Sequence, residues 1–450
     1  MPAAPKMRSL LILGLSTLLL ATLATSGFGR QDPTPTPAPP PSPPVPILSG
    51  NLPLTVVIPS AVSSPEQARP FFDSFSWQSF IALSWPAAKT PRGTPNQPND
   101  PSVFLKAAKG TPTVWGTYKE DFELFDQGSN RPAAWEAPNT SVGVCTAAKT
   151  GQKVFVRYTK GDSVVEIQNQ AFSYPLIDQS KNYAVYEIRF NQAQYNFIRG
   201  TDADPTSWLY LAKNLAAKEP ISMPMSAPPS TQGALMVKAG WKIIDPKKDN
   251  AARFYTVSAQ VYDPLSKKCS PQTVGLVGIH IVQKLAAFPQ WIWSTFEQVD
   301  NVTKSFNNGT STPPTIGGYA NRPPNPAPQL QLAKDRAPVQ VTRFNPIPDS
   351  TAALNPKFQK LMGKTVWQYY QLVMTQWPTQ PLNFKTMEAG GIYPQNSGGA
   401  FPVNGVTNTV METYFQSQND AAGAGGNSCM SCHYRAGQAD FSWTLMRSAH

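Results

Sequence analysis

The chain has 450 residues, a formal net charge of +11 and 47 prolines, and 41% of its residues are hydrophobic. This length allows one large or two ordinary domains with a real core, and a charged fraction of only 14% argues against intrinsic disorder. The positive charge would suit nucleic acid, but no dense basic run supports such a partner and we expect none. The positive charge would then serve docking to acidic proteins or simply solubility.

The first residues have the pattern of a secretory signal peptide. Lys6 and Arg8 precede an apolar run from Leu10 to Ala24, which is shorter than the roughly 20 residues that a membrane-spanning helix needs. Small residues around Thr25 suit cleavage, and an uncleaved anchor is the alternative. We therefore expect residues 1–26 to direct export to a bacterial periplasm. The mature protein would have no stable transmembrane anchor, while loose association with the membrane is left open.

A proline-rich stretch, QDPTPTPAPPPSPPVP, dominates residues 27–51 and predicts an extended linker that cannot pack into a core. After it, residues 52–302 are expected to form an α+β body. Its first helix is predicted to start at Ser64, which is followed by proline and by a glutamine in capping-box position, and to be cut short or kinked by Pro70. A second, short amphipathic helix is indicated around Trp77.

The middle of the chain has the spacing of β-strands. Between Lys153 and Phe190, the segments KVFVRYT, VVEIQ and YAVYEIRF are rich in aromatic and β-branched residues, and SWLYLAKNLAAK then predicts a helix. Three longer strands follow between Ala234 and Leu285, separated by short turn-rich segments that favour antiparallel pairing. The expected fold is therefore α+β, with an antiparallel β meander from Ala234 to Leu285 and flanking helices.

The last third of the chain is expected to be helical. Residues 303–354, rich in proline and asparagine, would connect the sheet to a helical segment at residues 355–450. Asn355 and the proline after it suggest a helix start, and an apolar stripe predicts that this helix continues to Trp377. The stripe consists of Phe358, Leu361, Met362, Thr365, Tyr369, Leu372 and Val373. A capping box at Thr409 predicts another helix, before a glycine-rich lead.

The most specific pattern is Cys429-Met430-Ser431-Cys432-His433, which has the spacing C-x-x-C-H. Each thiol can bond one vinyl group of a haem, and the adjacent imidazole can bind the iron. With only four cysteines and three histidines in the chain, chance rarely produces this pattern. It predicts one covalent haem c, attached through Cys429 and Cys432, with His433 as the proximal axial ligand of the iron.

Two other interpretations of the motif remain open. A structural zinc site needs four ligands, so the motif would have to recruit Cys145, Cys269 or His280. A redox-active or structural disulfide between Cys429 and Cys432 would not need the histidine, and the βαβ context of a thioredoxin-like site is missing.

At the motif, the chain resembles c-type cytochromes. The segments FSWQSFIALSWPA, GLVGIHIVQK, PQWIWSTFEQVDN and SCMSCHYRAGQADFSW are also similar to a group of large exported bacterial proteins described only as cytochrome c family members. The resemblance implies haem attachment and no particular reaction. Because only residues 434–450 follow the motif, the walls around a haem should come from the upstream segments 355–377 and 409–418, with the sheet behind them.

The sixth position of the iron would decide between electron transfer and catalysis. His280, in the middle of an apolar strand, is a candidate distal ligand, although a histidine in such a place is more often a hydrogen-bonded core residue. Met446 and His450 are weaker candidates, because core packing and a frayed terminus are their ordinary roles.

Two further pairs of residues invite a functional interpretation. Cys145 and Cys269 are the cysteines left over by the motif, so an exported protein is expected to link them in a disulfide. Glu297 and Asp300 could form an acid/base pair, although a packed element with a polar face is the commoner explanation.

These features together predict an exported monohaem c-type cytochrome that transfers electrons in periplasmic redox chemistry. Its partner would be a redox protein or a small-molecule electron donor or acceptor. One alternative is a haem-dependent oxidoreductase or peroxidase with an open axial position, so whether the protein is an enzyme is undecided. Another is a non-redox binding protein stabilised by zinc or a disulfide.

Overall fold

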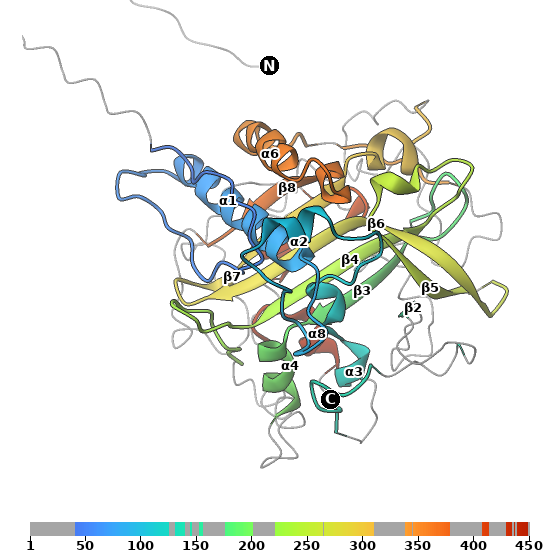
Figure 1. Ribbon diagram of the computed structural model, residues 1–450, viewed down its shortest axis with the longest axis horizontal. Helices are drawn as coiled ribbons and strands as arrows, with labels where there is room; N and C mark the ends of the chain where they lie inside the picture. Colours follow the sequence, from blue (N-terminus) through green and yellow to red (C-terminus); the bar gives the residue numbers. More distant parts are fainter. Residues whose placement is uncertain are drawn as a thin grey trace, which may run out of the picture. The chain divides into compact units, whose positions relative to one another are not determined.

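A curled sheet of eight strands organises the part of the chain that the computed structural model describes (Figure 1). The described residues are 41–125, 131–139, 145, 153–155, 176–200, 221–263, 265–309, 338–343, 345–378, 407–413, 429–433, 436 and 439–448. The strands are β1 (Lys119–Glu120), β2 (Lys153–Phe155), β3 (Val185–Phe190), β4 (Leu235–Ile243), β5 (Thr256–Asp263), β6 (Lys268–Leu285), β7 (Phe288–Gln298) and β8 (Tyr370–Gln376).

Helices flank this sheet, so the expected α+β class is the class found. The α-helices are α1 (Pro65–Ser84), α2 (Pro101–Leu105), α3 (Phe122–Phe125), α4 (Gln192–Arg199), α6 (Asp349–Leu361), α7 (Cys429–His433) and α8 (Trp443–Ser448). The 3-10 turns are η1 (Trp115–Thr117), η3 (Ala251–Arg253) and η5 (Val366–Tyr369), and η4 (Asn301–Ser305) is one turn of π-helix. Among the described residues, no helix has both the length and the hydrophobicity needed to cross a membrane.

The long strand β6 is the centre of the sheet. Val274 pairs with Ile243 of β4 and also with Val257 of β5, so β4 and β5 lie on opposite edges of β6. Further along β6, β7 pairs on the edge away from β4, and β8 pairs with β7. The predicted meander is therefore wrong in its order, because β4 pairs with β6 and not with β5. The sheet is also mixed, since β2 runs parallel to β5.

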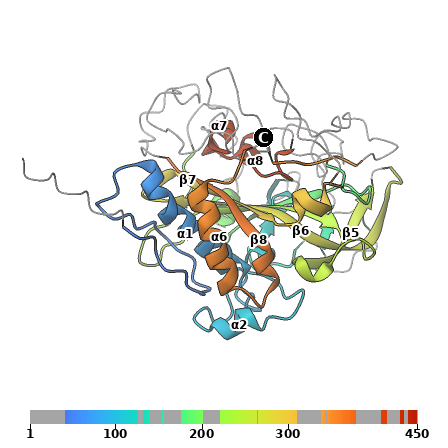
Figure 2. The same ribbon diagram turned by 90° about the horizontal axis from the view of Figure 1, so that it is seen from above.

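The two faces of the sheet carry different helices (Figure 2). On one side, α1 and α6 pack together and against β8. On the other side lie α7 and α8, and we call this side the motif face. Residues directly opposite each other on paired strands share a face, so Lys238, His280 and Thr295 of β4, β6 and β7 all belong to the motif face.

Helix α1 begins as the sequence indicates, since the Ser64 hydroxyl accepts a hydrogen bond from the Gln67 N–H at 3.3 Å. Contrary to expectation, it then continues through Pro70 as one helix of 20 residues. A proline inside a helix costs about 3 kcal/mol. Burial of a large apolar side chain contributes about 1.5–3 kcal/mol, and Trp77, Phe80 and several further aromatic residues of α1 are buried. The free energy gained by burying these side chains therefore exceeds the cost of Pro70, and the helix continues.

The helix predicted from Asn355 to Trp377 is also wrong. Helix α6 starts earlier, at Asp349, and ends at Leu361, after which the chain turns and continues as strand β8. Asn355 is not a cap: its Oδ1 accepts from Trp77 Nε1 at 3.0 Å and from the Leu372 N–H at 3.2 Å. The side chain thus ties α1, α6 and β8 together, and the expected helical C-terminal segment contains a sheet strand.

Several expectations cannot be compared with the structure. The signal peptide, the VVEIQ segment, the helix at 207–218 and residues 310–337 lie outside the described residues. Of the helix expected from Thr409, the structure describes only residues up to 413, which form a turn. In that turn Asn408, not Thr409, is the capping residue, because its Oδ1 accepts from the Val410 N–H at 3.1 Å.

Candidate functional site

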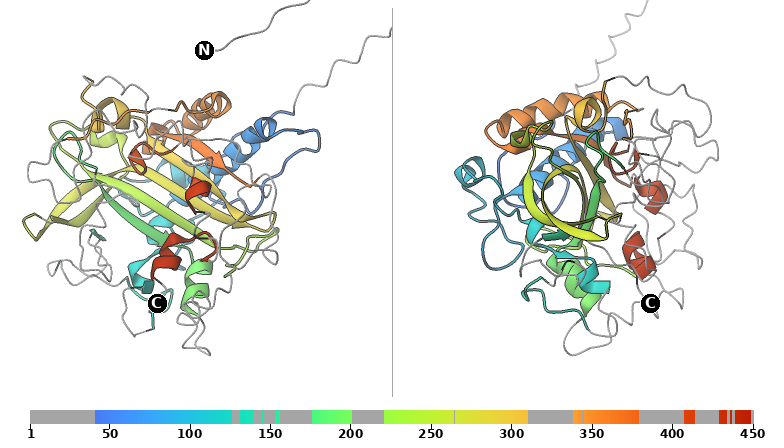
Figure 3. Two further views of the ribbon diagram at one scale, coloured as in Figure 1. Left: turned by 180° about the vertical axis from the view of Figure 1, so that it is seen from behind. Right: turned by 90° about the vertical axis from the view of Figure 1, so that its right-hand side faces the viewer.

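The C-x-x-C-H motif forms the short helix α7 on the motif face of the sheet (Figure 3, red). Residues three and four apart in a helix share a side, so this backbone places position 429 on the same side as positions 432 and 433. Cys429 and His433 are half-buried, whereas Met430 is buried and donates its N–H to Gln376 Oε1 of β8 at 3.1 Å. The motif is therefore attached to the sheet and still partly accessible. The side chain of Cys432 lies outside the described part of the chain.

The ring of His433 is held by a backbone carbonyl from the tail of the chain. Its Nδ1 lies 2.6 Å from the carbonyl oxygen of Phe441. A carbonyl oxygen only accepts hydrogen bonds, so Nδ1 carries the proton and Nε2 keeps its lone pair. Burial lowers the pKa of His433 to about 4, which keeps the ring neutral near pH 7. This is the tautomer and the charge state that a metal-binding histidine needs.

Strand β7 supplies a wall beside this histidine. The ring centroids of Trp293 and His433 are 4.3 Å apart, and Trp293 Nε1 donates to the Gln290 carbonyl at 3.1 Å, which fixes the indole. Val373 and Met374 of β8 pack near Cys429. Walls from the upstream chain were expected, but they come from strands β7 and β8 rather than from a helix at 355–377.

The carbonyl that holds His433 belongs to a strained turn. Asp440 and Phe441 have φ angles of 52° and 64°, in the left-handed region that residues other than glycine rarely adopt. The Asp440 carboxylate fixes this turn: it binds Lys284 Nζ at 2.5 Å, the Met223 N–H at 2.7 Å and Trp291 Nε1 at 3.2 Å. Both side chains of the Asp440–Lys284 pair are fully buried. The position of the Phe441 carbonyl is thus determined by the sheet.

His280 lies close to the motif, but both of its ring nitrogens are already engaged. Nδ1 lies 2.9 Å from Thr295 Oγ1, and Nε2 lies 2.7 Å from Glu412 Oε1. Thr295 Oγ1 in turn lies 3.9 Å from Cys429 Sγ. His280 therefore has the contacts of a hydrogen-bonded core residue, and distal ligation would require Glu412 to release Nε2. The side chain of Met446 and the whole of His450 lie outside the described residues.

The remaining candidates have structural partners. The sulfur atoms of Cys145 and Cys269 form a disulfide, as the sequence suggests, so these thiols are not available to complete a zinc site. Within the described residues, no group of three or more histidine, cysteine, aspartate or glutamate side chains is arranged to hold a metal ion. Glu297 pairs with Arg343 and Asp300 with Arg253, which argues against an acid/base pair.

Sequence reasoning missed the groups that orient the motif. The Phe441 carbonyl is a backbone atom and has no sequence signature, and Asp440 meets Lys284 across 156 residues. Trp293 could have been placed on the same face as Thr295 by strand alternation, once the segment was taken as a strand.

Comparison with known proteins does not place the chain in a family. No family model matches it, and neither a curated protein nor a solved structure shows significant similarity. A functional assignment therefore rests on the motif and on the geometry around it.

Proposed function

We propose that this protein is an exported monohaem c-type cytochrome that works in periplasmic redox chemistry. The observation that carries the proposal is the hydrogen bond from His433 Nδ1 to the Phe441 carbonyl, because it prepares Nε2 to bind iron. A histidine held this way immediately after two cysteines at C-x-x-C spacing fits a covalently attached haem better than a structural disulfide.

The residues around the motif fit such a group. Cys429 and Cys432 would attach the haem, and His433 would be the proximal ligand. When bound, the haem supplies one-electron redox chemistry at its iron. The chain would hold the proximal ring through Phe441 and pack Trp293 against it, so that the orientation of the imidazole does not depend on the haem itself. The expected partner is a redox protein or a small-molecule electron donor or acceptor.

The state of His280 supports a second candidate function. Because both of its nitrogens are hydrogen-bonded, His280 has no free lone pair for iron in this arrangement. Among the described residues, no histidine other than His433 and His280 is present. An iron without a strong distal ligand would suit a haem-dependent oxidoreductase or peroxidase. We retain electron transfer as the leading proposal and this enzyme activity as the alternative.

Absorption spectra of the purified protein separate the two functions. If His280 is the distal ligand, the oxidised protein will be low-spin, will bind carbon monoxide slowly when reduced, and will become open to it in the His280→Ala variant. If the native protein is high-spin and binds carbon monoxide at once, the enzyme becomes the leading proposal. A Thr342→Ala variant, which changes a buried hydroxyl away from the motif contacts described above, is the matched control and should keep the native spectrum.

A further inference from the structure

A fully buried contact between a lysine and an aspartate joins the tail of the chain to the sheet. Lys284 Nζ lies 2.5 Å from Asp440 Oδ2, and neither side chain has any exposed surface. Lys284 belongs to β6, whereas Asp440 lies 156 residues further along the chain, in the turn that holds the Phe441 carbonyl. An ordinary buried ion pair keeps both charges. The surroundings of this pair favour a chemical reaction between the two groups instead.

The backbone holds the two side chains against each other. The Lys284 N–H donates to the Ala234 carbonyl at 3.0 Å, and the Lys284 carbonyl accepts from the Ser226 N–H at 2.8 Å. Asp440 is fixed in the strained turn described above, with a φ angle of 52°. Groups held in well-oriented contact react as if their concentration were about 10⁵–10⁸ M. The amine nitrogen is therefore positioned for attack on the carboxyl carbon, one bond beyond Oδ2.

The same burial favours the uncharged forms of both groups. It lowers the pKa of Lys284 and raises the pKa of Asp440, because each ion loses its hydration. Among the described residues, Lys284 is the one charged group in contact with Asp440. Transfer of one proton along the contact gives an amine and a carboxylic acid, and no second ion opposes this transfer. A desolvated lysine amine is a nucleophile, and the carbon of an uncharged carboxyl group is its electrophile.

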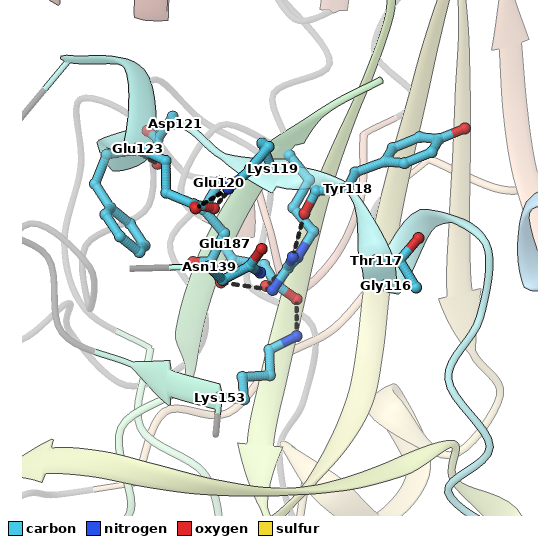
Figure 4. Close-up of polar contacts among 12 residues, drawn as sticks. Gly116, Thr117, Tyr118, Lys119, Glu120, Asp121, Glu123, Asn139, Lys153 and Glu187 are labelled. Carbon is cyan, nitrogen blue, oxygen red and sulfur yellow. Dashed lines mark hydrogen bonds and ion pairs between the residues drawn. The ribbon is translucent and has the colours of Figure 1, made fainter. Parts of the chain in front are cut away.

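Another buried lysine contact shows what prevents such a reaction (Figure 4). Lys153 Nζ also lies 2.5 Å from a carboxylate, that of Glu187. Here Arg189 Nε binds the same carboxylate at 2.7 Å, and an arginine does not lose its charge in proteins. Burial alone would raise the pKa of Glu187, but the charges of Arg189 and Lys153 lower it, so Glu187 stays ionised. An ionised carboxylate is a poor electrophile, and this pair is the internal control.

Hydrogen-bond donors surround the Asp440 carboxyl group where charge would develop. Trp291 Nε1 donates to Oδ1 at 3.2 Å, and the Met223 N–H donates to Oδ2 at 2.7 Å. When Nζ adds to the carboxyl carbon, negative charge collects on Oδ1, next to the indole N–H. One such donor typically accelerates acyl chemistry by about 10²–10³. Ser222 Oγ lies 3.2 Å from Nζ and can accept a hydrogen bond from it.

We infer that Lys284 and Asp440 become joined by an intramolecular amide bond. The Nζ–Cγ bond forms, the Cγ–Oδ2 bond breaks, and Oδ2 leaves as water, taking its second hydrogen from Nζ. No oxidant, reductant or cofactor takes part. The linkage ties the tail of the chain to β6 and so fixes the Phe441 carbonyl that orients His433. It forms whether or not a haem is attached.

Peptide mapping of the full-length protein, after denaturation and reduction of its disulfide, tests this inference. Trypsin should not cleave after Lys284 and should release one branched peptide, in which residues 269–304 are joined to residues 436–447. Its mass should equal the sum of the two peptides less one water molecule. Trypsin should cleave normally after Lys153, the lysine of the control pair. Cleavage after Lys284, with a free peptide 436–447, would overturn the inference and leave an ordinary ion pair.

Two variants test the roles of single groups. Lys284→Met removes the nucleophile at similar volume, so it should give only the free peptide 436–447. Trp291→Phe keeps a ring but removes the indole N–H, and the linkage should form about a hundredfold more slowly in newly synthesised protein. A branched peptide that persists in Lys284→Met, or an unchanged rate in Trp291→Phe, would contradict the proposed reaction. The map of the native protein decides the outcome even if neither variant folds.

Discussion

The position of one proton decides what His433 can do. With Nδ1 donating to the Phe441 carbonyl, the ring offers Nε2 as a ligand, and its pKa of about 4 keeps that lone pair available. The carbonyl is held by the turn at Asp440, whose carboxylate accepts from Lys284, Trp291 and the Met223 N–H. A buried ion pair far from the motif in sequence therefore positions the proposed proximal ligand.

Removing the Asp440 carboxylate should lower the stability of the fold. We predict that Asp440→Ala lowers the free energy of unfolding by about 3–5 kcal/mol, because it leaves the ammonium group of Lys284 buried without its partner. Urea unfolding measures the loss. The double variant Asp440→Ala/Lys284→Met should recover part of the stability, since no unpaired charge then remains. A loss below about 1 kcal/mol in the single variant would show that the pair does not hold the turn.

Residue identity alone was enough to propose part of the candidate site. The two cysteines and the histidine were recognisable from their spacing, because haem attachment needs those groups in that order. The sequence suggested that His280 could be a hydrogen-bonded core residue, as strand histidines often are. It did not indicate the partners, Thr295 and Glu412. Such partners come from strand register and from a distant turn, and neither is encoded in local sequence.

At the scale of elements, local helix signals were outweighed by tertiary contacts. The chain was expected to stay helical after Asn355, but beyond Leu361 it becomes η5 and then strand β8. The apolar residues of YQLVMTQ fit the spacing of a strand as well as that of a helix, so periodicity alone does not distinguish the two. Pairing with β7 decides the outcome, and the Asn355 side chain supports it by bonding both backbone groups of Leu372. The same competition explains why α1 continues through Pro70.

The contact between α1 and α6 contains a buried carboxyl whose titration should be measurable. Thr351 Oγ1 donates to Asp73 Oδ2 at 2.6 Å, and burial raises the pKa of Asp73 from 3.8 to about 6. Between these two values the folded state binds more protons than the unfolded state, so stability falls as pH rises through this window. Above pH 6 the penalty is complete and amounts to about 3 kcal/mol at most.

Asp73→Asn should therefore stabilise the protein at about pH 8 by about 1–3 kcal/mol and change stability little at about pH 4. The amide keeps an oxygen that can accept from Thr351 and carries no charge. Urea unfolding at the two pH values is the measurement. Asp349→Asn, at an exposed carboxylate in α6, is the control and should show no such pH-dependent gain. Destabilisation of Asp73→Asn at the higher pH would mean that Asp73 is ionised and paired in the fold.

At the scale of the whole molecule, the two faces of one sheet differ in what covers them. The motif face carries the proposed haem attachment, whereas α1 and α6 pack on the other side. The α+β class and most strands were predictable from β-branched and aromatic runs. The order of the strands was not, because β6 pairs with β4, β5 and β7 at once and that choice depends on contacts across the whole chain.

The disulfide between Cys145 and Cys269 closes a loop over 124 residues of sequence. Constraining so long a loop in the unfolded chain typically stabilises a protein by about 2–4 kcal/mol. We predict a loss of that size in the Cys145→Ser/Cys269→Ser double variant, measured by urea unfolding. Native protein treated with a reductant should lose a similar amount. If neither treatment changes stability, the two cysteines are not linked in the purified protein.

Covalent haem attachment is the most direct test of the proposed function. Protein purified from a host that matures c-type cytochromes should give a haem stain at its own mass after denaturing electrophoresis, and acid–acetone extraction should not remove it. Cys429→Ala/Cys432→Ala should abolish the stain, whereas Cys145→Ser/Cys269→Ser should keep it. Native protein without covalent haem, or an unchanged stain in Cys429→Ala/Cys432→Ala, would contradict the account.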